Sequence, residues 1–334
     1  MSRAPLAALS LATASLAAAL VVAGPASAAT NPWLERSRPL NIAHQGGEDE
    51  FPSNTMYAFR SSLKAGADML ELDVGVTKDD QVVVMHDTTL DRTTSGSGTI
   101  ASHTLAQVEK LDGAYWFHAS TDNAYEHGRS SKSYTFRGVA TGRKRAPKGY
   151  SAADFRVPTL KQVLKAFPHT PINIEIKGRT KAEDPSEYLK NADVLGALLK
   201  HNARKDIVVV SFQQPAVDRF HTIAPQVPLA PGIGGSADFL LGSKSPGAGV
   251  VAFQLPITYE LNGQTLNVTT PDNVARAHRG GYAWHTWLSD DGEGVPTWTR
   301  LIDDCVDGVM TAEPVKFEAL LRKHARPTSC AAQY

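Results

Sequence analysis

The stretch from Asn41 to Thr94 contains two histidines and two closely spaced carboxylates: His44, Glu71, Asp73 and His86. An imidazole titrates near neutral pH, so two of them can divide the proton transfers of a reaction between them. Carboxylate oxygens are the ligands that hard divalent cations prefer in proteins. These residue types predict a polar reaction site, provided that the surrounding elements bring the four side chains together.

The first histidine follows a short apolar run. Leu40 to Ala43 has the pattern of a buried strand that ends at His44 and the glycines after it. Ser53 or Asn54 can then cap a helix, which would stop at Gly66. The apolar face of this helix is formed by Met56, Phe59 and Leu63.

The two carboxylates lie on one predicted strand, Met69 to Val76. Side chains alternate along a strand, so Glu71 and Asp73 point to the same side. Alternating carboxylates usually mark a solvated face, but the other residues of this strand are apolar. Because a buried charge needs a partner or a metal ion, the strand indicates a site rather than a surface.

The second histidine ends a predicted hairpin. The turn at 77–80 is too short for a helical crossover, so the chain from Gln81 to His86 must return antiparallel. Two alternative two-residue loops are possible. One places His86 opposite Glu71, and the other places it opposite Asp73. A three-residue loop turns His86 to the other face, because a slip of one residue flips every side chain. Although a lone histidine is more often a surface residue, both two-residue registers predict an imidazole against the carboxylates.

The order of motifs resembles that of the glycerophosphodiester phosphodiesterases. The shared motifs are His-x-Gly at 44–46, Pro-x-Asn-Thr at 52–55, Glu-Leu-Asp-Val at 71–74, His-Asp at 86–87 and Leu-Asp-Arg-Thr-Thr at 90–94. The resemblance covers most of the chain after residue 28. It implies hydrolysis of glycerophosphodiesters such as glycerophosphocholine, with His44 and His86 as the catalytic acid and base. Either water or a neighbouring glycerol hydroxyl of the substrate would be the nucleophile.

A further motif, Asn-Ile-Glu-Ile-Lys-Gly, lies at 173–178. Strand alternation puts Glu175 and Lys177 on one face, where an ordinary cross-strand ion pair is the alternative to a site. The resemblance implies that Glu175 joins Glu71 and Asp73 as a metal ligand and that Lys177 lies near the phosphate. Three carboxylates without a Cys or His-rich pattern suit Ca²⁺ or Mg²⁺, and the sequence does not choose between these ions.

Two residues depart from the family pattern. The family usually has Arg where this chain has Gln45 and Glu where it has Ser53. Loss of the Arg removes a bidentate phosphate donor, so we expect Gln45 and Lys177 to contact the substrate. Among Glu48, Asp49 and Glu50, one carboxylate is expected to replace the missing Glu.

Strand-like and helical segments alternate along the rest of the chain. With the two strands above, the predicted strands are Ile172 to Ile176, Ile207 to Phe212, Val227 to Ala230, Gly249 to Phe253, Tyr282 to Trp287 and Gly308 to Thr311. Helical stretches include Glu187 to Leu199, Pro271 to His278 and Val315 to His324. Eight strand and helix units predict an α/β (β/α)8 TIM barrel. A doubly wound open sheet is the alternative, but the loop after the first strand lacks its glycine spacing.

A barrel places the motif residues at one end. His44, the carboxylates, Phe212 and Trp287 all lie toward the carboxyl ends of predicted strands, where barrel enzymes build their sites. Phe212 and Trp287 are therefore expected to contact the substrate. The family resemblance implies that the irregular segment at about 112–155 is an insertion that overhangs the pocket, and we expect mainly structural roles for Tyr115, Trp116 and Phe117.

Residues 1–28 have the pattern of a secretory signal peptide, because an apolar run follows Arg3 and ends at Ala26-Ser27-Ala28. A membrane anchor is the alternative, but we expect no stable membrane insertion and a secreted, extracellular domain over residues 29–334. In an exported chain, Cys305 and Cys330 are expected to form a disulfide worth roughly 3 kcal/mol, with two free thiols as the alternative.

The composition limits the partners. The formal net charge is zero and 42% of the 334 residues are hydrophobic, so the chain can bury one large core and has no basic surplus for nucleic acid. We expect a small-molecule phosphodiester as partner, and the sequence is silent on oligomeric state. An alternative is a phospholipase D-like or cyclising activity on lysolipids or sphingolipids, which needs an apolar groove that Trp287 and the insertion aromatics could begin. A non-catalytic binder is the remaining alternative, suggested only by Gln45 and Ser53.

Overall fold

A computed structural model of the chain describes residues 31–34, 37–119, 124–179, 185–261, 263–288 and 292–333. The predicted signal peptide, residues 1–28, lies outside these residues. None of the helices in the described part of the chain is long and apolar enough to cross a membrane.

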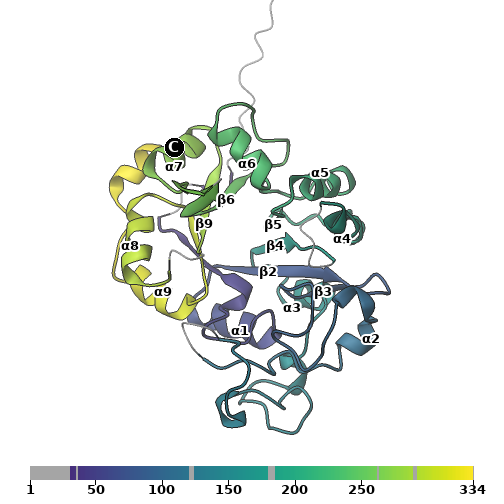
Figure 1. Cartoon of the computed structure of the whole chain (residues 1–334). Coiled ribbons are helices and arrows are strands. Elements are labelled where there is room, and N and C mark those ends of the chain that lie inside the picture. The colour runs from purple at the N-terminus through teal and green to yellow at the C-terminus, as the bar shows by residue number, and fades with distance from the viewer. Residues whose placement is uncertain are drawn as a thin grey trace, which may run out of the picture. The chain divides into compact units, whose positions relative to one another are not determined.

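Parallel strands form the centre of the domain (Figure 1). Their order around the sheet is β5-β4-β2-β1-β10-β9-β6. The bounds are β1 Leu40–Ala43, β2 Met69–Val76, β4 Ile172–Ile176, β5 Ile207–Val210, β6 Ala252–Pro256, β9 Ala283–Trp287 and β10 Gly308–Thr311. Most of these strands are entirely buried, as expected for a parallel sheet that is covered on both faces.

Leu229 connects the two outer strands of this sheet. It bridges in parallel to Val209 on β5 and to Val250, just before β6. Leu229 N donates to Gly249 O and Val251 N donates to Leu229 O, both at 2.9 Å. The predicted strand Val227 to Ala230 is thus reduced to a bridge, and the predicted strand Gly249 to Phe253 lies three residues later, at β6. The bridge occupies the eighth position of the predicted barrel.

Helices cover the outside of the sheet (Figure 1). They are α1 Met56–Ala65, α2 Leu105–Val108, α3 Leu160–Ala166, α4 Pro185–Leu199, α5 Gln214–Ile223, α6 Ile233–Leu240, α7 Pro271–Arg279, α8 Val295–Asp303 and α9 Pro314–Leu321. The predicted cap of α1 at Ser53 or Asn54 is wrong by one or two residues. Thr55 is the N-cap and its side chain accepts from Ala58 N, while Gly66 ends the helix in a left-handed conformation as predicted.

The hairpin after β2 has the third of the registers considered above. Strand β3, Val82–Val84, pairs antiparallel with β2, and Val74 lies opposite Val84. The loop therefore has three residues, and the last of them, Asp80, has a left-handed φ of 56°, which is typical of three-residue hairpin loops. The prediction that strand register points His86 at the carboxylates is wrong. His86 instead lies beyond the end of β3, so strand alternation does not fix the direction of its side chain.

Two further features complete the described domain. Cys305 and Cys330 form the predicted disulfide, with their Cα atoms 5.4 Å apart. A second antiparallel hairpin, which the sequence analysis missed, consists of β7 Thr258–Leu261 and β8 Gln264–Asn267. Its sequence signal is the Asn-Gly pair at 262–263 between two short alternating segments.

The described residues of the segment at 112–155, which are 112–119 and 124–155, form mainly turns and two short 3-10 helices, η3 Ser131–Ser133 and η4 Ala152–Phe155. They pack on one another through small apolar clusters, in which Phe117 and Phe155 are buried. The guanidinium of Arg137 lies within about 4.5 Å of the ring centroids of Tyr115 and Trp116. These contacts give the insertion aromatics the structural role that was expected of them.

Candidate active site

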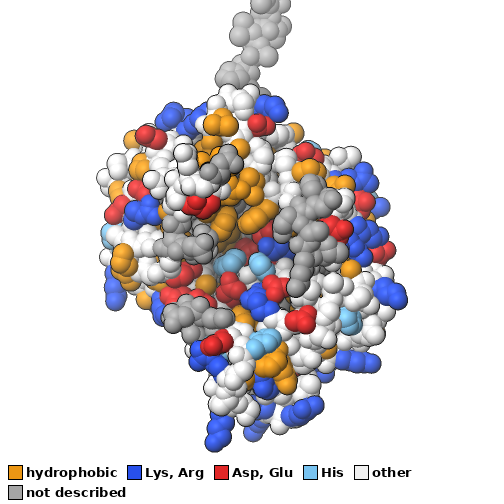
Figure 2. Space-filling model, in the orientation of Figure 1, with side chains coloured by type: hydrophobic (Ala, Val, Ile, Leu, Met, Phe, Trp, Pro, Cys, Tyr) orange, Lys and Arg blue, Asp and Glu red, His pale blue; other side chains and the backbone are white. Residues whose placement is uncertain are grey.

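A cavity of about 630 Å³ opens at the carboxyl ends of the barrel strands. Figure 2 shows it as a hollow in which acidic, basic and histidine side chains meet. Its lining includes most of the predicted site residues: His44, Glu71, His86, Glu175, Lys177, Phe212 and Trp287. No described residue of 112–155 lines it, so the expectation that the insertion overhangs the pocket is wrong for the part of that segment that the structure describes.

The three carboxylates come from neighbouring strands. Glu71 and Asp73 project from β2, and the parallel register places Asp73 directly opposite Glu175 on β4. One oxygen from each carboxylate lies within 4.8 Å of the other two. Lys177 Nζ is 2.8 Å from Glu175 Oε1 and 3.3 Å from Asp73 Oδ1. The sheet register therefore turns two separate sequence motifs into one acidic cluster.

Burial makes this cluster electrostatically unfavourable without a cation. Burial raises the pKa of the Glu71 carboxyl above its usual range, and repulsion from Asp73 raises it further. Burial also favours protonation of Asp73, but the charges of Lys177 and the two histidines, with the hydrogen bond from Asn54, together outweigh burial and lower the pKa of Asp73. Asp73 Oδ1 accepts no hydrogen bond from the described residues and is contacted by the Lys177 ammonium at 3.3 Å. A buried set of carboxylate oxygens such as this fits a hard divalent cation, which would relieve the repulsion.

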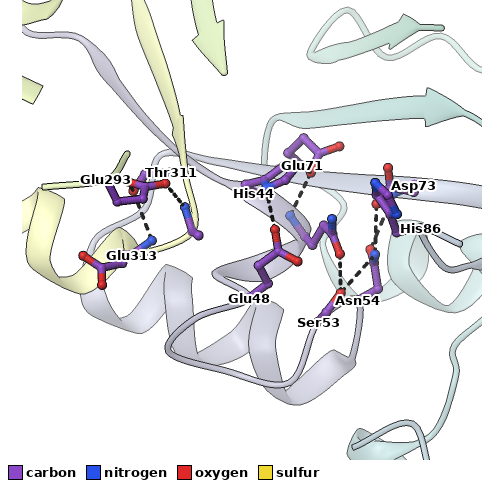
Figure 3. Close-up of polar contacts among 12 residues, drawn as sticks. His44, Glu48, Ser53, Asn54, Glu71, Asp73, His86, Glu293, Thr311 and Glu313 are labelled. Atoms are coloured by element: carbon purple, nitrogen blue, oxygen red, sulfur yellow. Dashed lines mark hydrogen bonds and ion pairs between the residues drawn. The ribbon is translucent and has the colours of Figure 1, made fainter. Parts of the chain in front are cut away.

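His44 begins the 3-10 turn η1, His44–Gly46, directly after β1. Its Nδ1 is 2.9 Å from Glu48 Oε1, and its Nε2 is 4.0 Å from Glu71 Oε2. Burial alone would lower the pKa of His44, but the carboxylates of Glu48, Glu71 and Asp73 raise it to about 10. Figure 3 shows Glu48 below the imidazole, on the side away from Glu71. Glu48 thus orients the ring through one nitrogen and leaves the other directed toward the carboxylates.

His86 is held by the residue that follows it. Its Nδ1 lies 2.8 Å from Asp87 Oδ1, and Arg92 donates to both oxygens of Asp87, at 2.8 and 3.0 Å. Burial would raise the pKa of Asp87, but the hydrogen bonds from His86 and Arg92 keep it well below its usual range. An ionised Asp87 fixes the proton of His86 on Nδ1 and leaves Nε2 free for chemistry.

The two aromatic residues form one wall of the cavity. Phe212 and Trp287 stack with their ring centroids 5.4 Å apart. Lys177 Nζ lies 5.4 Å from the centroid of the Phe212 ring, within the range of a cation–π contact. Burial alone would lower the pKa of Lys177, but Glu175 and Asp73 raise it above its usual value. The aromatic wall therefore begins next to Lys177, the only lysine or arginine among the described residues that line the cavity.

Gln45 does not line the cavity. Its side chain is buried, and its Oε1 accepts from Ser53 Oγ at 2.5 Å. The two residues that depart from the family pattern are thus hydrogen-bonded to each other. The backbone N of Gln45 donates to Glu71 Oε2 at 2.7 Å, so this position contacts the acidic cluster through its backbone. The geometry gives no support to a substrate contact by the Gln45 side chain.

The sequence analysis did not identify several residues that hold the site side chains in place. Asn54 Nδ2 donates to Asp73 Oδ2 at 3.0 Å, while Glu48 and Asp87 each contact one imidazole. Asn54 and Asp87 belong to the shared motifs, so their position beside the other motif residues was the available signal. Glu48 was considered only as one of three replacements for a carboxylate, and its contact with His44 depends on the turn geometry of η1.

The arrangement provides three functions in one cavity. The acidic cluster can hold a divalent cation, Lys177 supplies positive charge for an anionic group, and two imidazoles with oriented rings can exchange protons. A phosphodiester requires these functions, because its anion must be neutralised and its leaving oxygen protonated.

Comparison with known proteins agrees with this chemistry. Residues 44–316 match the glycerophosphoryl diester phosphodiesterase family. The glycerophosphodiester phosphodiesterase of Bacillus subtilis strain 168 is 28% identical over 287 residues, which cover 85% of this chain and 87% of that protein. Lysophospholipase D GDPD1 from Homo sapiens is 36% identical over 182 residues, which cover 54% of this chain and 50% of that protein.

Solved structures share the fold. A phosphodiesterase from Oleispira antarctica, solved with the product sn-glycerol-3-phosphate, aligns with a TM-score of 0.59 and 18% identity over 86% of this chain and 98% of that one. A glycerophosphoryl diester phosphodiesterase from Silicibacter pomeroyi aligns with a TM-score of 0.61 and 21% identity over 86% and 94% of the two chains. The predicted TIM barrel is confirmed, and the chain belongs to the glycerophosphoryl diester phosphodiesterase family.

Proposed function

We propose that this chain is a secreted, metal-dependent phosphodiesterase that hydrolyses glycerophosphodiesters such as glycerophosphocholine to glycerol 3-phosphate and an alcohol. The observation that supports it best is that Glu71, Glu175, Lys177, His44 and His86 line one cavity, with Asp73 buried opposite Glu175. The product in the Oleispira antarctica structure and the name of the Bacillus subtilis relative support the same reaction class.

Glu71, Asp73 and Glu175 would hold the cation. When bound, Ca²⁺ or Mg²⁺ would neutralise the phosphate and make its phosphorus more open to attack. Lys177, which already contacts Asp73 and Glu175, would bind a phosphate oxygen. Oxygen-only ligands favour these hard ions over zinc.

The two histidines would transfer the protons. One imidazole takes the proton of the attacking hydroxyl as the P–O bond forms, and the other gives a proton to the leaving alkoxide as its P–O bond breaks. With water as nucleophile, the products are glycerol 3-phosphate and the free alcohol. With the neighbouring glycerol hydroxyl as nucleophile, a cyclic phosphate forms first and is then opened by water. Glu48 and Asp87 hold the rings of His44 and His86 in position for either route.

Export is supported by two features of the chain. The leader pattern at residues 1–28 is that of a signal peptide. The disulfide between Cys305 and Cys330 is of a kind that persists in oxidising compartments. Expression of the full chain in a bacterial host, followed by N-terminal sequencing of protein from the medium, tests export. Protein retained in the cytoplasm with residue 1 intact would refute it.

A metal-supplemented substrate screen tests the reaction. The mature chain is stripped with a chelator, and release of glycerol 3-phosphate from glycerophosphocholine is measured as Ca²⁺ or Mg²⁺ is added. We expect activity only with a metal ion. Glu175→Gln should lose both this activity and metal binding measured by calorimetry, whereas Asp91→Asn, an exposed carboxylate outside the cluster, should keep both. Full activity of the stripped protein would refute metal dependence.

A further inference from the structure

A second, apolar hollow of about 250 Å³ lies beside the catalytic cavity. The two hollows share four lining residues: Val210, Phe212, Gln254 and Trp287. The aromatic pair of Phe212 and Trp287 therefore stands between the acidic cluster and this hollow. In Figure 2, hydrophobic side chains gather next to the central hollow, on the side where Figure 1 places α6 and β6.

One wall of the hollow is the helix α6. Ile233, Ala237, Leu240 and Leu241 line it, at the i, i+4, i+7 and i+8 spacing of one helical face. Leu241, just after the helix, is 82% exposed, and Ile233 is 38% exposed. Leu240 is partly buried against the neighbouring core, whereas Ile233, Ala237 and Leu241 remain exposed.

The opposite wall is the β7–β8 hairpin, which is amphipathic. Tyr259 pairs with Leu266 and lies on the same face as Leu261, and all three line the hollow. On the other face, Thr265 donates a hydrogen bond to Glu260. Two-stranded hairpins alone are marginally stable and usually bury their apolar face, yet Leu261 and Leu266 are 50% and 41% exposed.

Among the described residues that line this hollow, none carries a charge and few are polar. Of the seven large hydrophobic side chains that are exposed in the described part of the chain, five line this hollow: Phe212, Ile233, Leu241, Leu261 and Leu266. Gathering of exposed apolar side chains in one groove is typical of a binding site. A charged head group would lose its hydration here without gaining a partner, so the occupant must be a hydrocarbon.

We propose that the groove between α6 and the β7–β8 hairpin binds the single acyl chain of a monoacyl glycerophosphodiester whose phosphate lies in the catalytic cavity. This inference rests on the proposed function, because it assumes that the catalytic cavity binds the glycerophosphate part that all glycerophosphodiesters share. A chain carried on the glycerol can pass the Phe212 and Trp287 rings into the groove whatever alcohol is released. Continuity of the groove with the catalytic cavity favours this occupant over a separate protein.

The test compares monoacyl glycerophosphocholines whose chains have six to ten carbons, each kept below its critical micelle concentration, with glycerophosphocholine. For the metal-loaded mature chain, we expect kcat/KM to rise two- to fourfold per added methylene until the groove is full, because each buried methylene contributes at most about fourfold. A flat series with normal turnover of glycerophosphocholine would overturn the groove and leave the proposed function intact. A rise that appears only above the critical micelle concentration would also overturn it, because it would indicate adsorption to a surface.

Two variants locate the effect. Ala237→Trp fills the groove from an exposed helix position, and Leu266→Ser removes an apolar wall. We expect Ala237→Trp to flatten the chain-length series and Leu266→Ser to lower kcat/KM for the longest chain three- to tenfold. Turnover of glycerophosphocholine should not change, since neither residue lines the catalytic cavity. Val315→Ser, at an exposed apolar residue on α9 that lines neither hollow, is the matched control and should behave as wild type.

A binding measurement separates the groove from catalysis. Titration calorimetry with monomeric alkylphosphocholines of six to ten carbons should show affinity that increases with chain length and decreases in Ala237→Trp. If this binding is present and no phosphodiester is turned over, the proposed function fails and the groove stands. If affinity is independent of chain length, or if sedimentation shows a dimer that alkylphosphocholine dissociates, the acyl-chain proposal fails.

Discussion

Asp87→Asn tests whether the imidazole of His86 works only when its ring and proton are held in place. Asp87 accepts from His86 at 2.8 Å and is itself held by both hydrogen bonds from Arg92. Asn at this position has the same shape but no charge, and its amide nitrogen can face Nδ1 instead of an acceptor. The hydrogen bond that fixes the tautomer would then be lost.

The expected magnitude follows from the type of contact. Hydrogen bonds to a charged group contribute about 1.5 to 3 kcal/mol, and about 1.4 kcal/mol corresponds to tenfold in rate. Asp87→Asn should therefore lower kcat by roughly 10- to 150-fold. KM should change little, because Asp87 acts on the imidazole. His86→Ala should cost on the order of 10² to 10⁴ in rate.

The assay is release of glycerol 3-phosphate from glycerophosphocholine at saturating metal ion. If Asp87 acts through His86, the double variant Asp87→Asn/His86→Ala should be no slower than His86→Ala alone, because residues of one unit are not additive. Asp91→Asn, in the same loop, should stay within about twofold of wild type, and thermal melting checks that all variants fold. Additive losses in the double variant, or an unchanged rate in Asp87→Asn, would refute this reasoning.

The leaving group identifies which histidine is the acid. p-Nitrophenolate leaves without protonation, so a variant that lacks only the acid should recover much of its rate on a p-nitrophenyl phosphodiester. One of His44→Ala and His86→Ala should recover and the other should remain slow. Near wild-type turnover of glycerophosphocholine by either variant would show that the histidine concerned is structural.

Three further predictions concern stability and the departures from the family pattern. Cys305→Ser should melt several degrees below wild type, as a loop-closure contribution of about 3 kcal/mol implies, and denatured unreduced wild type should show no free thiol. Asp307→Asn should lower the free energy of unfolding by about 3 kcal/mol at neutral pH, since Asp307 is buried against His278 and its pKa is lowered. The stabilisation by the ionised carboxylate disappears as pH falls through the folded-state pKa of Asp307. The difference in melting temperature between variant and wild type should therefore narrow in acid. Gln45→Arg alone should lower the melting temperature of the protein, because the side chain at position 45 is buried against Ser53. Adding Ser53→Glu should restore the melting temperature. If the double variant melts no higher than Gln45→Arg, the two side chains are not coupled.

The sequence alone determined the features that depend on local pattern. Strand alternation placed Glu71 and Asp73 on one side of β2, and the structure keeps them there. Apolar runs and glycine stops gave the main strands and α1 to within a few residues. These features were predictable because the periodicity of a strand or helix is fixed by backbone geometry and needs no distant partner.

The position of His86 was not determined in this way. Two-residue and three-residue loops are both compatible with Thr77 to Gln81, and they differ in which face each side chain takes. The left-handed φ of Asp80 selects the longer loop. Arg92 then fixes Asp87 and thereby His86, so a side-chain contact and not the strand pattern orients this imidazole.

The remaining features depend on contacts between distant segments. Register between β2 and β4 brings Glu175 to Asp73, and backbone pairing at Leu229 connects β5 to the start of β6. The apolar faces of α6 and the β7–β8 hairpin are visible in the sequence only as two separate short patterns. Whether they pack together or leave a groove depends on how the barrel spaces them, because packing is a property of the assembled elements and local pattern specifies only which face is apolar.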